Sequence, residues 1–367
     1  MTFQKIVEPW KTKETFRLVH RGLSPGKGQL VVGLTDLPRS CWTAALVDEI
    51  KQPVLVITPN SEGAKTAYGD LVSLLPEGKV YFFPQLDLLP YEVYAQNVEI
   101  AAQRMTVLAK LAREEAIVVV TPVDALLKKI VSQDTIKKYS LSLSTGEKND
   151  IHELSRRLIS MGYTKEDLVE VPGTFSIRGG IIDIFPLTEN FPLRVEFFDD
   201  EIESIRFFDP DTQRSLTETG QVFLPPADEF PADEESLTTA GKALRKELEA
   251  VLPSYSGAVR RHLRDKFSPY LEQMEQGIWT KGMEQFMTYF YPEAGGIADY
   301  LPPAGLVIIH EPDQVRENLE KMRREIDSWY YELLEEGKIL PSFGNNFLDF
   351  DSFRTMVQRH ALVLMAH

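Results

Sequence analysis

The stretch QLVVGLTDLPRSCWTAALVDEI, residues 29–50, joins a short apolar run to a loop and a helix-like pattern. The same alternation continues to about residue 127. Its later β-branched runs are PVLVITP, KVYFFP and AIVVVTP, and amphipathic segments follow each of them, the last being VDALLKKI. Parallel strands that are buried on both faces appear in sequence as continuous apolar runs separated by helices. The sequence therefore predicts an α/β domain whose parallel sheet is covered by helices on both faces.

Composition limits the classes of function. The chain has 367 residues and is 43% hydrophobic, which favours two or three domains over a single core. Forty Lys and Arg against 55 Asp and Glu give a net charge of −15, so we expect no tight nonspecific DNA binding. The single cysteine, Cys41, is expected to be buried and inert, and the six histidines have no metal-ligand spacing, so no metal site is predicted. No segment has the apolar core of a signal peptide or membrane span, which leads us to expect a cytoplasmic protein without membrane contact.

The pattern changes near residue 130. After a helical segment around residues 152–161, GTFSIRGGIIDIFP (173–186) and LRVEFFDDEIESIRFFD (193–209) each read as two strands around a tight turn. They predict an antiparallel meander of about four strands. A Pro- and acid-rich exit linker, LPPADEFPADEES (224–236), precedes two helical patterns and a last buried-strand run, GLVIIHEPDQV, from residue 305. Because that run resembles the first domain, the β-rich domain is predicted to be an insertion in a larger α/β domain.

The loop GLTDLPRS, residues 33–40, resembles a phosphate-binding loop whose functional groups are missing. A working G-x-x-x-x-G-K-[ST] loop places backbone N–H groups and a lysine on the phosphates and a hydroxyl on Mg²⁺. Here Gly33 and Ser40 fit, but Pro38 replaces the second glycine and Arg39 replaces the lysine. Proline has no N–H to donate, and arginine is not equivalent to lysine in this position. An ordinary strand-to-helix turn, with Pro38 near the helix start, is the alternative interpretation.

The strand GLVIIHEPDQV has the form of a metal-binding Walker B strand, in which an apolar run ends in Asp-Glu. His310 takes the aspartate position and is followed by Glu311. Neutral imidazole is a poor ligand for Mg²⁺, which prefers oxygen donors. Both halves of one nucleotide site are therefore defective, and we expect no ATP cofactor. A structural histidine at a strand end is the alternative for His310.

With both strands in place, the sequence resembles the UvrB-homology module at the N-terminus of the bacterial transcription-repair coupling factor, Mfd. GLTDLPRS corresponds to the UvrB-type GxTGSGKT, and GTFSIRGGIIDIFP with LRVEFFDDEIESIRFFD is the most specific match. The resemblance covers nearly the whole chain. It implies a degenerate P-loop helicase-like parallel-sheet domain with an inserted antiparallel β-rich α+β domain. The implied parts are domain 1a (1–130) with the degenerate Walker A loop, the UvrA-docking domain 2 (131–226), and domain 1b (227–367), which returns to the first sheet.

The resemblance also distinguishes between relatives. UvrB-like proteins carry a long tyrosine-rich hairpin that grips DNA, whereas only residues 86–100 lie in that interval here, with Tyr91 and Tyr94. The missing hairpin and the broken ATP site both point to Mfd. Because that family continues beyond ALVLMAH, the chain is expected to be an N-terminal fragment. RNA polymerase and DNA would then bind through absent C-terminal domains, which carry the family's translocase.

Strand alternation places Phe175 on one face of the GTFSIRGG strand and Ser176 and Arg178 on the other. In LRVEFF, Arg194 and Glu196 likewise lie on a polar face. A solvated face with cross-strand ion pairs is the simplest interpretation. The resemblance implies instead that this face docks UvrA, with Arg178 and Glu196 matching the family motif. Lys165 stands where UvrB usually has arginine, and Ser176 replaces another arginine.

Three hypotheses follow from the sequence. The leading one is a non-catalytic module that recruits UvrA to stalled transcription complexes in nucleotide excision repair. The alternative is an ATP-dependent, UvrB-like DNA-damage-binding helicase relative, which differs at Pro38, Arg39 and His310. The third is a P-loop-like scaffold with some other partner.

Overall fold

The computed structural model describes residues 4–86 and 97–367, so Tyr91 and Tyr94 lie outside the described residues. The larger part of the fold is a six-stranded sheet with the order β1-β14-β13-β2-β4-β3, in which every neighbouring pair is parallel. Its strands are β1 (Gly28–Val32), β2 (Val54–Thr58), β3 (Val80–Phe82), β4 (Val118–Pro122), β13 (Leu306–His310) and β14 (Ala361–Ala366). The predicted parallel α/β domain is confirmed.

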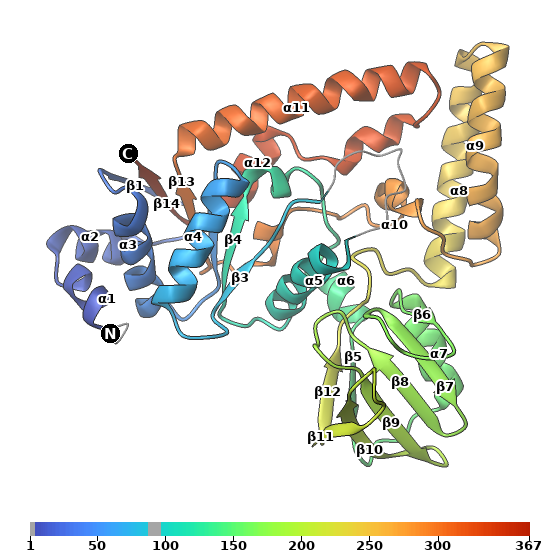
Figure 1. Cartoon of the computed structure of the whole chain (residues 1–367). Coiled ribbons are helices and arrows are strands. Elements are labelled where there is room, and N and C mark those ends of the chain that lie inside the picture. Colours follow the sequence, from blue (N-terminus) through green and yellow to red (C-terminus); the bar gives the residue numbers. More distant parts are fainter. Residues whose placement is uncertain (1–3, 87–96) are drawn as a thin grey trace.

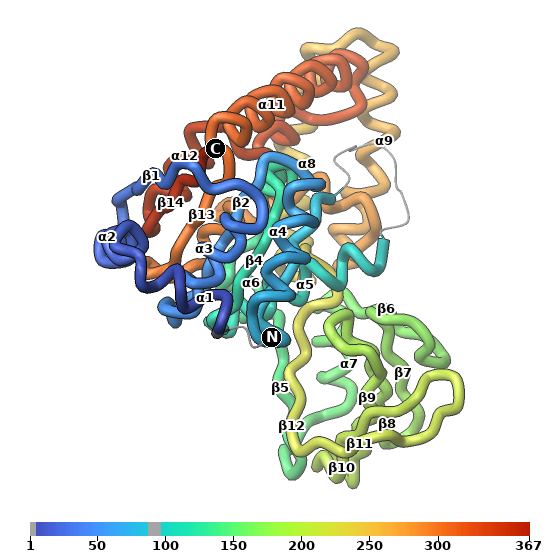
Figure 2. The backbone as a smooth tube through the Cα atoms, turned by 60° about the vertical axis from the view of Figure 1, so that its left-hand side comes forward, coloured from blue at the N-terminus to red at the C-terminus, as the bar shows by residue number. Residues whose placement is uncertain are grey.

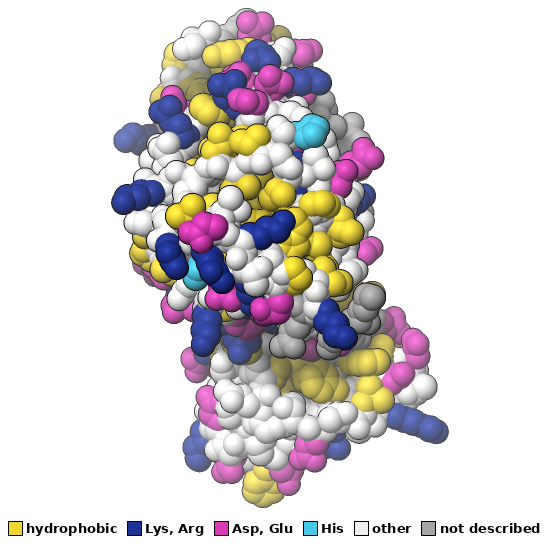
Figure 3. All heavy atoms as spheres, turned by 90° about the vertical axis from the view of Figure 1, so that its left-hand side faces the viewer, with side chains coloured by type: hydrophobic (Ala, Val, Ile, Leu, Met, Phe, Trp, Pro, Cys, Tyr) yellow, Lys and Arg dark blue, Asp and Glu magenta, His cyan; other side chains and the backbone are white. Residues whose placement is uncertain are grey.

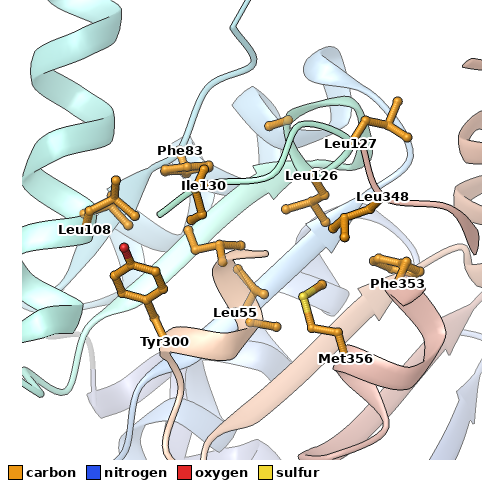
Figure 4. Packing of buried hydrophobic residues seen from close by; sticks show 14 of the residues in the cluster. Leu55, Phe83, Leu108, Leu126, Leu127, Ile130, Tyr300, Leu348, Phe353 and Met356 are labelled. Atoms are coloured by element: carbon orange, nitrogen blue, oxygen red, sulfur yellow. The ribbon is translucent and has the colours of Figure 1, made fainter. Parts of the chain in front are cut away.

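Helices cover both faces of this sheet. Apolar side chains of α1 (Gln4–Lys11), α2 (Glu14–Gly22), α3 (Asp36–Glu49) and α4 (Ser61–Leu74) share one buried cluster with alternate residues of the central strands. The opposite cluster contains residues of α5 (Val98–Ala112), α6 (Gln133–Lys138), α11 (Pro312–Glu335) and α12 (Phe350–Val357). Figure 4 shows this second cluster, which gathers Leu55 of β2, Leu108 of α5 and Met356 of α12. Burial on both faces explains why the strands are continuous apolar runs.

The chain leaves this sheet after β4 and returns to it much later. Leu306 of β13 pairs with Val54 of β2, and β14 is inserted between β13 and β1. The predicted return of the GLVIIHEP strand to the first sheet is therefore confirmed. Figures 1 and 2 both show the intervening β-rich segment as a separate lobe beside the parallel sheet.

The β-rich lobe contains a six-stranded sheet with the order β11-β10-β9-β8-β7-β6. The predicted four-strand meander is confirmed as β7 (Thr174–Arg178), β8 (Ile181–Phe185), β9 (Leu193–Phe198) and β10 (Glu201–Phe208). Edge strands β6 (Thr164–Lys165) and β11 (Ser215–Thr219) extend it, and β5 (Leu141–Ser144) pairs with β12 (Gln221–Leu224). The predicted helix around residues 152–161 is α7 (Ile151–Ser160), whose Leu154 and Leu158 enter the lobe's core.

The connections between the two parts are packed. Ile136 of α6 belongs to the core of the parallel-sheet domain, and the core of the β-rich lobe begins with Tyr139. In the exit linker, Glu229 is buried and forms a bidentate ion pair with the buried Arg104 of α5. Burial, with Glu284 adding to it, raises the pKa of the neighbouring Asp228 to about 7. The predicted exit linker thus contributes buried residues to the interior.

The two helical patterns after the linker form α8 (Glu234–Val251) and α9 (Gly257–Glu275), which pack together with the short α10 (Met287–Phe290). Figure 1 shows α8 and α9 as a hairpin at the side of the molecule. Two local predictions differ from the structure. The helix α3 begins at Asp36, earlier than the apolar pattern from Ser40 suggests. The segment VDALLKKI contains only a 3-10 turn over Val123–Leu126. In the described ranges, no helix combines the length and the apolar character that crossing a membrane requires.

Candidate functional site

The loop after β1 leaves the strand at Gly33, whose φ of +86° is favoured by glycine. Thr35 is the N-cap residue of α3, so Pro38 lies in the first turn of the helix. Proline is tolerated there because first-turn N–H groups have no partner within the helix. The helix thus begins inside the segment that would form a phosphate loop.

Arg39 turns back onto this loop. Its Nε and Nη2 atoms donate hydrogen bonds to the carbonyl oxygen of Leu34 at 3.1 and 2.9 Å. Its Nη2 atom also forms an ion pair with the carboxylate of Glu311, which follows β13. The two motifs that the sequence analysis singled out therefore meet in space, and Arg39 links them directly.

Ser40 does not face the loop. Its side chain is buried, and its hydroxyl donates a 2.8 Å hydrogen bond to the Asp70 carboxylate of α4. The hydroxyl that would bind Mg²⁺ in a working phosphate loop is therefore engaged between α3 and α4.

His310 ends β13 and is only 5% exposed. Burial, with the positive charge of Arg39 adding to it, lowers its pKa to about 3, so the imidazole is neutral near pH 7. Over the described part of the chain, its Nε2 atom has no hydrogen-bond partner. Glu311, with a φ of +47°, donates its backbone N–H to the carbonyl oxygen of Met365 at 2.7 Å. The strand end therefore offers one carboxylate, and that carboxylate is already paired with Arg39.

The second candidate site lies on the meander of the β-rich lobe. Strand register places Ser176, Asp183, Arg194 and Arg206 in one row across β7 to β10. A neighbouring row contains Arg178, Ile181, Glu196 and Ser204. Phe175 and Val195 point into the core on the opposite face, and both are fully buried. The predicted division of these strands into a core face and a polar face is confirmed.

Asp183 is the centre of the polar face. Its side chain is 1% exposed and accepts hydrogen bonds from Arg194 Nε and Nη2 at 2.7 and 2.8 Å. Arg178 Nη2 donates to the same carboxylate at 2.7 Å, while half of the Arg178 side chain remains exposed to solvent. The guanidinium of Arg194 also stacks on Phe208 with a separation of 4.5 Å. Arg194 therefore neutralises the buried aspartate, and Arg178 connects it to the surface.

Glu196 has a similar arrangement nearer the surface. Its carboxylate forms an ion pair with Arg206 and accepts a 3.0 Å hydrogen bond from the Ser204 hydroxyl. Both charged side chains are partly exposed. The face therefore carries fixed positive and negative groups side by side, held by cross-strand partners.

Ser176 and Lys165 do not join this arrangement. Ser176 lies on the polar face but is only 1% exposed, which corrects the expectation that it belongs to the solvent-facing surface. The cause is its position directly opposite the buried Asp183. Within the described residues its hydroxyl has no hydrogen-bond partner. Lys165 is exposed on the edge strand β6 and pairs in register with the core-facing Phe175, so it is offset from the row of Arg178.

The sequence reasoning placed Arg194 on the polar face but missed Asp183 and Arg206 as members of the network. A signal was present in IIDIF, where a single aspartate interrupts an otherwise apolar strand. A buried aspartate needs charged or hydrogen-bonding partners, and cross-strand neighbours are the closest source of them.

Comparisons with known proteins match one region of the chain and nearly its whole length. A sequence model of the UvrB interaction domain matches residues 141–230, which include the whole meander. The chain is similar to the transcription-repair-coupling factor of Bacillus subtilis (strain 168), with 34% identity over 339 residues that make up 92% of this chain and 29% of that protein. The protein of the same name from Staphylococcus aureus (strain bovine RF122 / ET3-1) is 28% identical over 329 residues, 90% of this chain and 28% of that protein.

The chain thus spans less than a third of the length of these relatives. The match nevertheless extends over nine-tenths of the chain, and the interaction-domain model lies within the chain at residues 141–230. These matches support the identification of the chain as an N-terminal module of a transcription-repair-coupling factor that contains a UvrB interaction domain.

Proposed function

We propose that this chain is a non-catalytic docking module that recruits UvrA to stalled transcription complexes in nucleotide excision repair. The observation that carries the proposal is the polar face of the matched UvrB interaction domain, where Arg178 and Glu196 hold opposite charges in fixed positions. Fixed charges at a partly exposed face favour a partner with complementary charges.

Arg178 is suited to this role because it is both held and available. One of its nitrogens bonds to Asp183, and half of its side chain is exposed. A guanidinium has five N–H donors, so several remain free for an acidic group of UvrA. The Asp183 contact reduces the side-chain entropy that docking would otherwise cost.

The proposal includes the absence of nucleotide chemistry in this chain. A nucleotide phosphate would have to displace Glu311 from Arg39, and Pro38 offers it no N–H group. The neutral His310 replaces the carboxylate that would hold Mg²⁺. These features support the docking module over the alternative of an ATP-dependent, UvrB-like helicase relative. RNA polymerase and DNA would be contacted by other domains of the longer protein.

A titration of the intact chain with UvrA tests the proposal. We expect saturable binding that does not require ATP on this chain. A parallel calorimetric titration with Mg-ATP should give no saturable heat at millimolar nucleotide. Absence of UvrA binding would refute the docking function, and Mg-ATP binding that is lost in Arg39→Ala would favour the helicase alternative.

A further inference from the structure

Phe198 is the last residue of β9 and is 76% exposed. It belongs to the meander, and its neighbour in sequence, Phe197, packs against the core. Figure 1 shows the β9–β10 turn at the end of the β-rich lobe that lies away from the parallel sheet. Phe198 is therefore open to a partner without interference from the larger domain.

Strand geometry places Phe198 beside the proposed UvrA-docking residues. It follows Glu196 by two positions on β9, so the two side chains project from the same face about 7 Å apart along the strand. Glu196 pairs in register with Ile181, which pairs with Arg178. Arg178, Ile181, Glu196 and Phe198 thus form one surface, which we call the tip face.

The backbone around Phe198 is held in place. The N–H of Phe197 donates a 2.8 Å hydrogen bond to the carbonyl oxygen of Gly180, which joins the β7–β8 turn to β9. A Cβ atom at Gly180 would lie 3.0 Å from the carbonyl oxygen of Phe197, so this approach depends on glycine. The next turn is fixed by Asp200, whose carboxylate binds Lys148 at 3.0 Å and whose carbonyl oxygen accepts the N–H of Asn149 at 2.8 Å.

A single exposed apolar residue is common on protein surfaces and by itself indicates nothing. Phe198 differs because three features coincide: a large exposed ring, a fixed backbone and direct neighbours with opposite fixed charges. Interface hot spots typically combine an aromatic anchor with arginine, and a rigid anchor loses little entropy on binding.

We propose that Phe198 is the apolar anchor of the tip face and inserts into an apolar pocket on UvrA that is bordered by an acidic group for Arg178. This inference rests on the proposed function and adds a contact residue to the same site. Specificity then comes from the spacing of one ring and two charges, because a partner with only complementary charge would leave the ring in water.

The test measures the affinity of UvrA for the intact chain and for three variants. Phe198→Ala should weaken binding about 30-fold, the size of a hot-spot loss. Phe198→Leu should keep affinity within a few-fold of the unmodified chain, because it retains an apolar side chain. The matched control is Ile159→Ala, which removes another exposed apolar side chain of the lobe, on α7, the helix that packs on the opposite, core face of the sheet.

The outcomes separate the two claims. If the unmodified chain binds UvrA and Phe198→Ala stays within about twofold of it, the anchor is wrong while the docking function stands. If Ile159→Ala weakens binding as much as Phe198→Ala, the loss is not specific to the tip face, and the anchor is again wrong. If the unmodified chain does not bind UvrA, both the docking function and the anchor are refuted. Melting temperatures of all variants should match that of the unmodified chain, since both positions are exposed.

Discussion

Arg194 and Arg178 bind the same buried carboxylate, yet removing them should have very different effects on stability. Arg194 contributes two hydrogen bonds to Asp183 and is mostly buried, whereas Arg178 contributes one and is half exposed. Removing one partner of a buried ion pair costs ~3–5 kcal/mol, and an exposed pair contributes ~0–1 kcal/mol. Because Arg178 would still contact Asp183, we expect Arg194→Ala to cost about 2–4 kcal/mol. Arg178→Ala should cost less than about 1 kcal/mol.

Hydrogen exchange measured by mass spectrometry suits this comparison, because it reports the stability of each part of a multidomain chain separately. Peptides that cover β8 and β9 should exchange at least about 30-fold faster in Arg194→Ala, which corresponds to about 2 kcal/mol. The same peptides should change by less than about fivefold in Arg178→Ala. Peptides from β2 and β4 provide the internal control, since the parallel sheet has its own core.

Equal acceleration in the two variants would contradict the assignment of Arg194 as the structural partner and Arg178 as the available one. So would an Arg194→Ala variant whose exchange in β8 and β9 is unchanged. The comparison matters for function, because Arg178→Ala can report on docking only if the domain stays folded.

Further predictions concern pH, a buried hydroxyl and DNA. The folded-state pKa of His310 is about 3, against an ordinary value of 6.5. The free energy of unfolding should therefore fall as the pH drops from about 6.5 towards 3. In thermal melts, His310→Gln should remove this part of the pH dependence. Asp228 should have the opposite effect on the pH dependence of stability, because its pKa is raised from 3.8 to about 7. Its stabilising contribution is present below about pH 3.8 and is lost as the pH rises to about 7. Asp228→Asn should reduce that loss of stability. Ser176→Ala should change neither stability nor UvrA binding by a measurable amount, because the hydroxyl is buried without a partner in the described structure. A loss of UvrA binding would show that the docking face is assigned to the wrong residues. The chain has a net charge of −15, and on the face seen in Figure 3 basic side chains are interspersed with acidic and apolar ones. Gel shifts at physiological salt should therefore show DNA affinity weaker than about 1 µM and no preference for damaged duplex.

Much of the architecture was predictable from periodicity. Strands such as VLVIT and LVIIH are apolar on both faces because helices cover both faces, whereas TFSIR and LRVEFF alternate because only one face meets a core. The return of β13 to the first sheet followed from its apolar character. These features depend on local sequence, and local sequence was sufficient to predict them.

The features that sequence reasoning missed depend on distant contacts. Arg39 and Glu311 are 272 positions apart, and no local pattern shows that they form an ion pair. Alternation correctly placed Ser176 on the polar face but could not show that a buried aspartate on the next strand takes that part of the face out of solvent. The linker containing Glu229 has the composition of an exposed segment, but Glu229 is buried and pairs with Arg104, a contact that no local pattern shows.

The most direct test of the docking function compares two arginines of similar exposure. Arg178 and Arg245 are 50% and 47% exposed, and each forms an ion pair with a carboxylate, Asp183 and Glu275 respectively. Arg178 lies on the tip face, whereas Arg245 lies on α8 in the helical hairpin. The measurement is the dissociation constant of UvrA for the chain with Arg178→Ala and with Arg245→Ala.

If UvrA docks on the tip face, Arg178→Ala leaves an acidic group of the partner desolvated and unpaired, which typically costs ~2–5 kcal/mol, or at least about 30-fold in affinity. Arg245→Ala should leave the dissociation constant within about twofold of the unmodified chain. Equal affinities for the two variants, with both domains folded by hydrogen exchange, would contradict the proposal that UvrA binds this face.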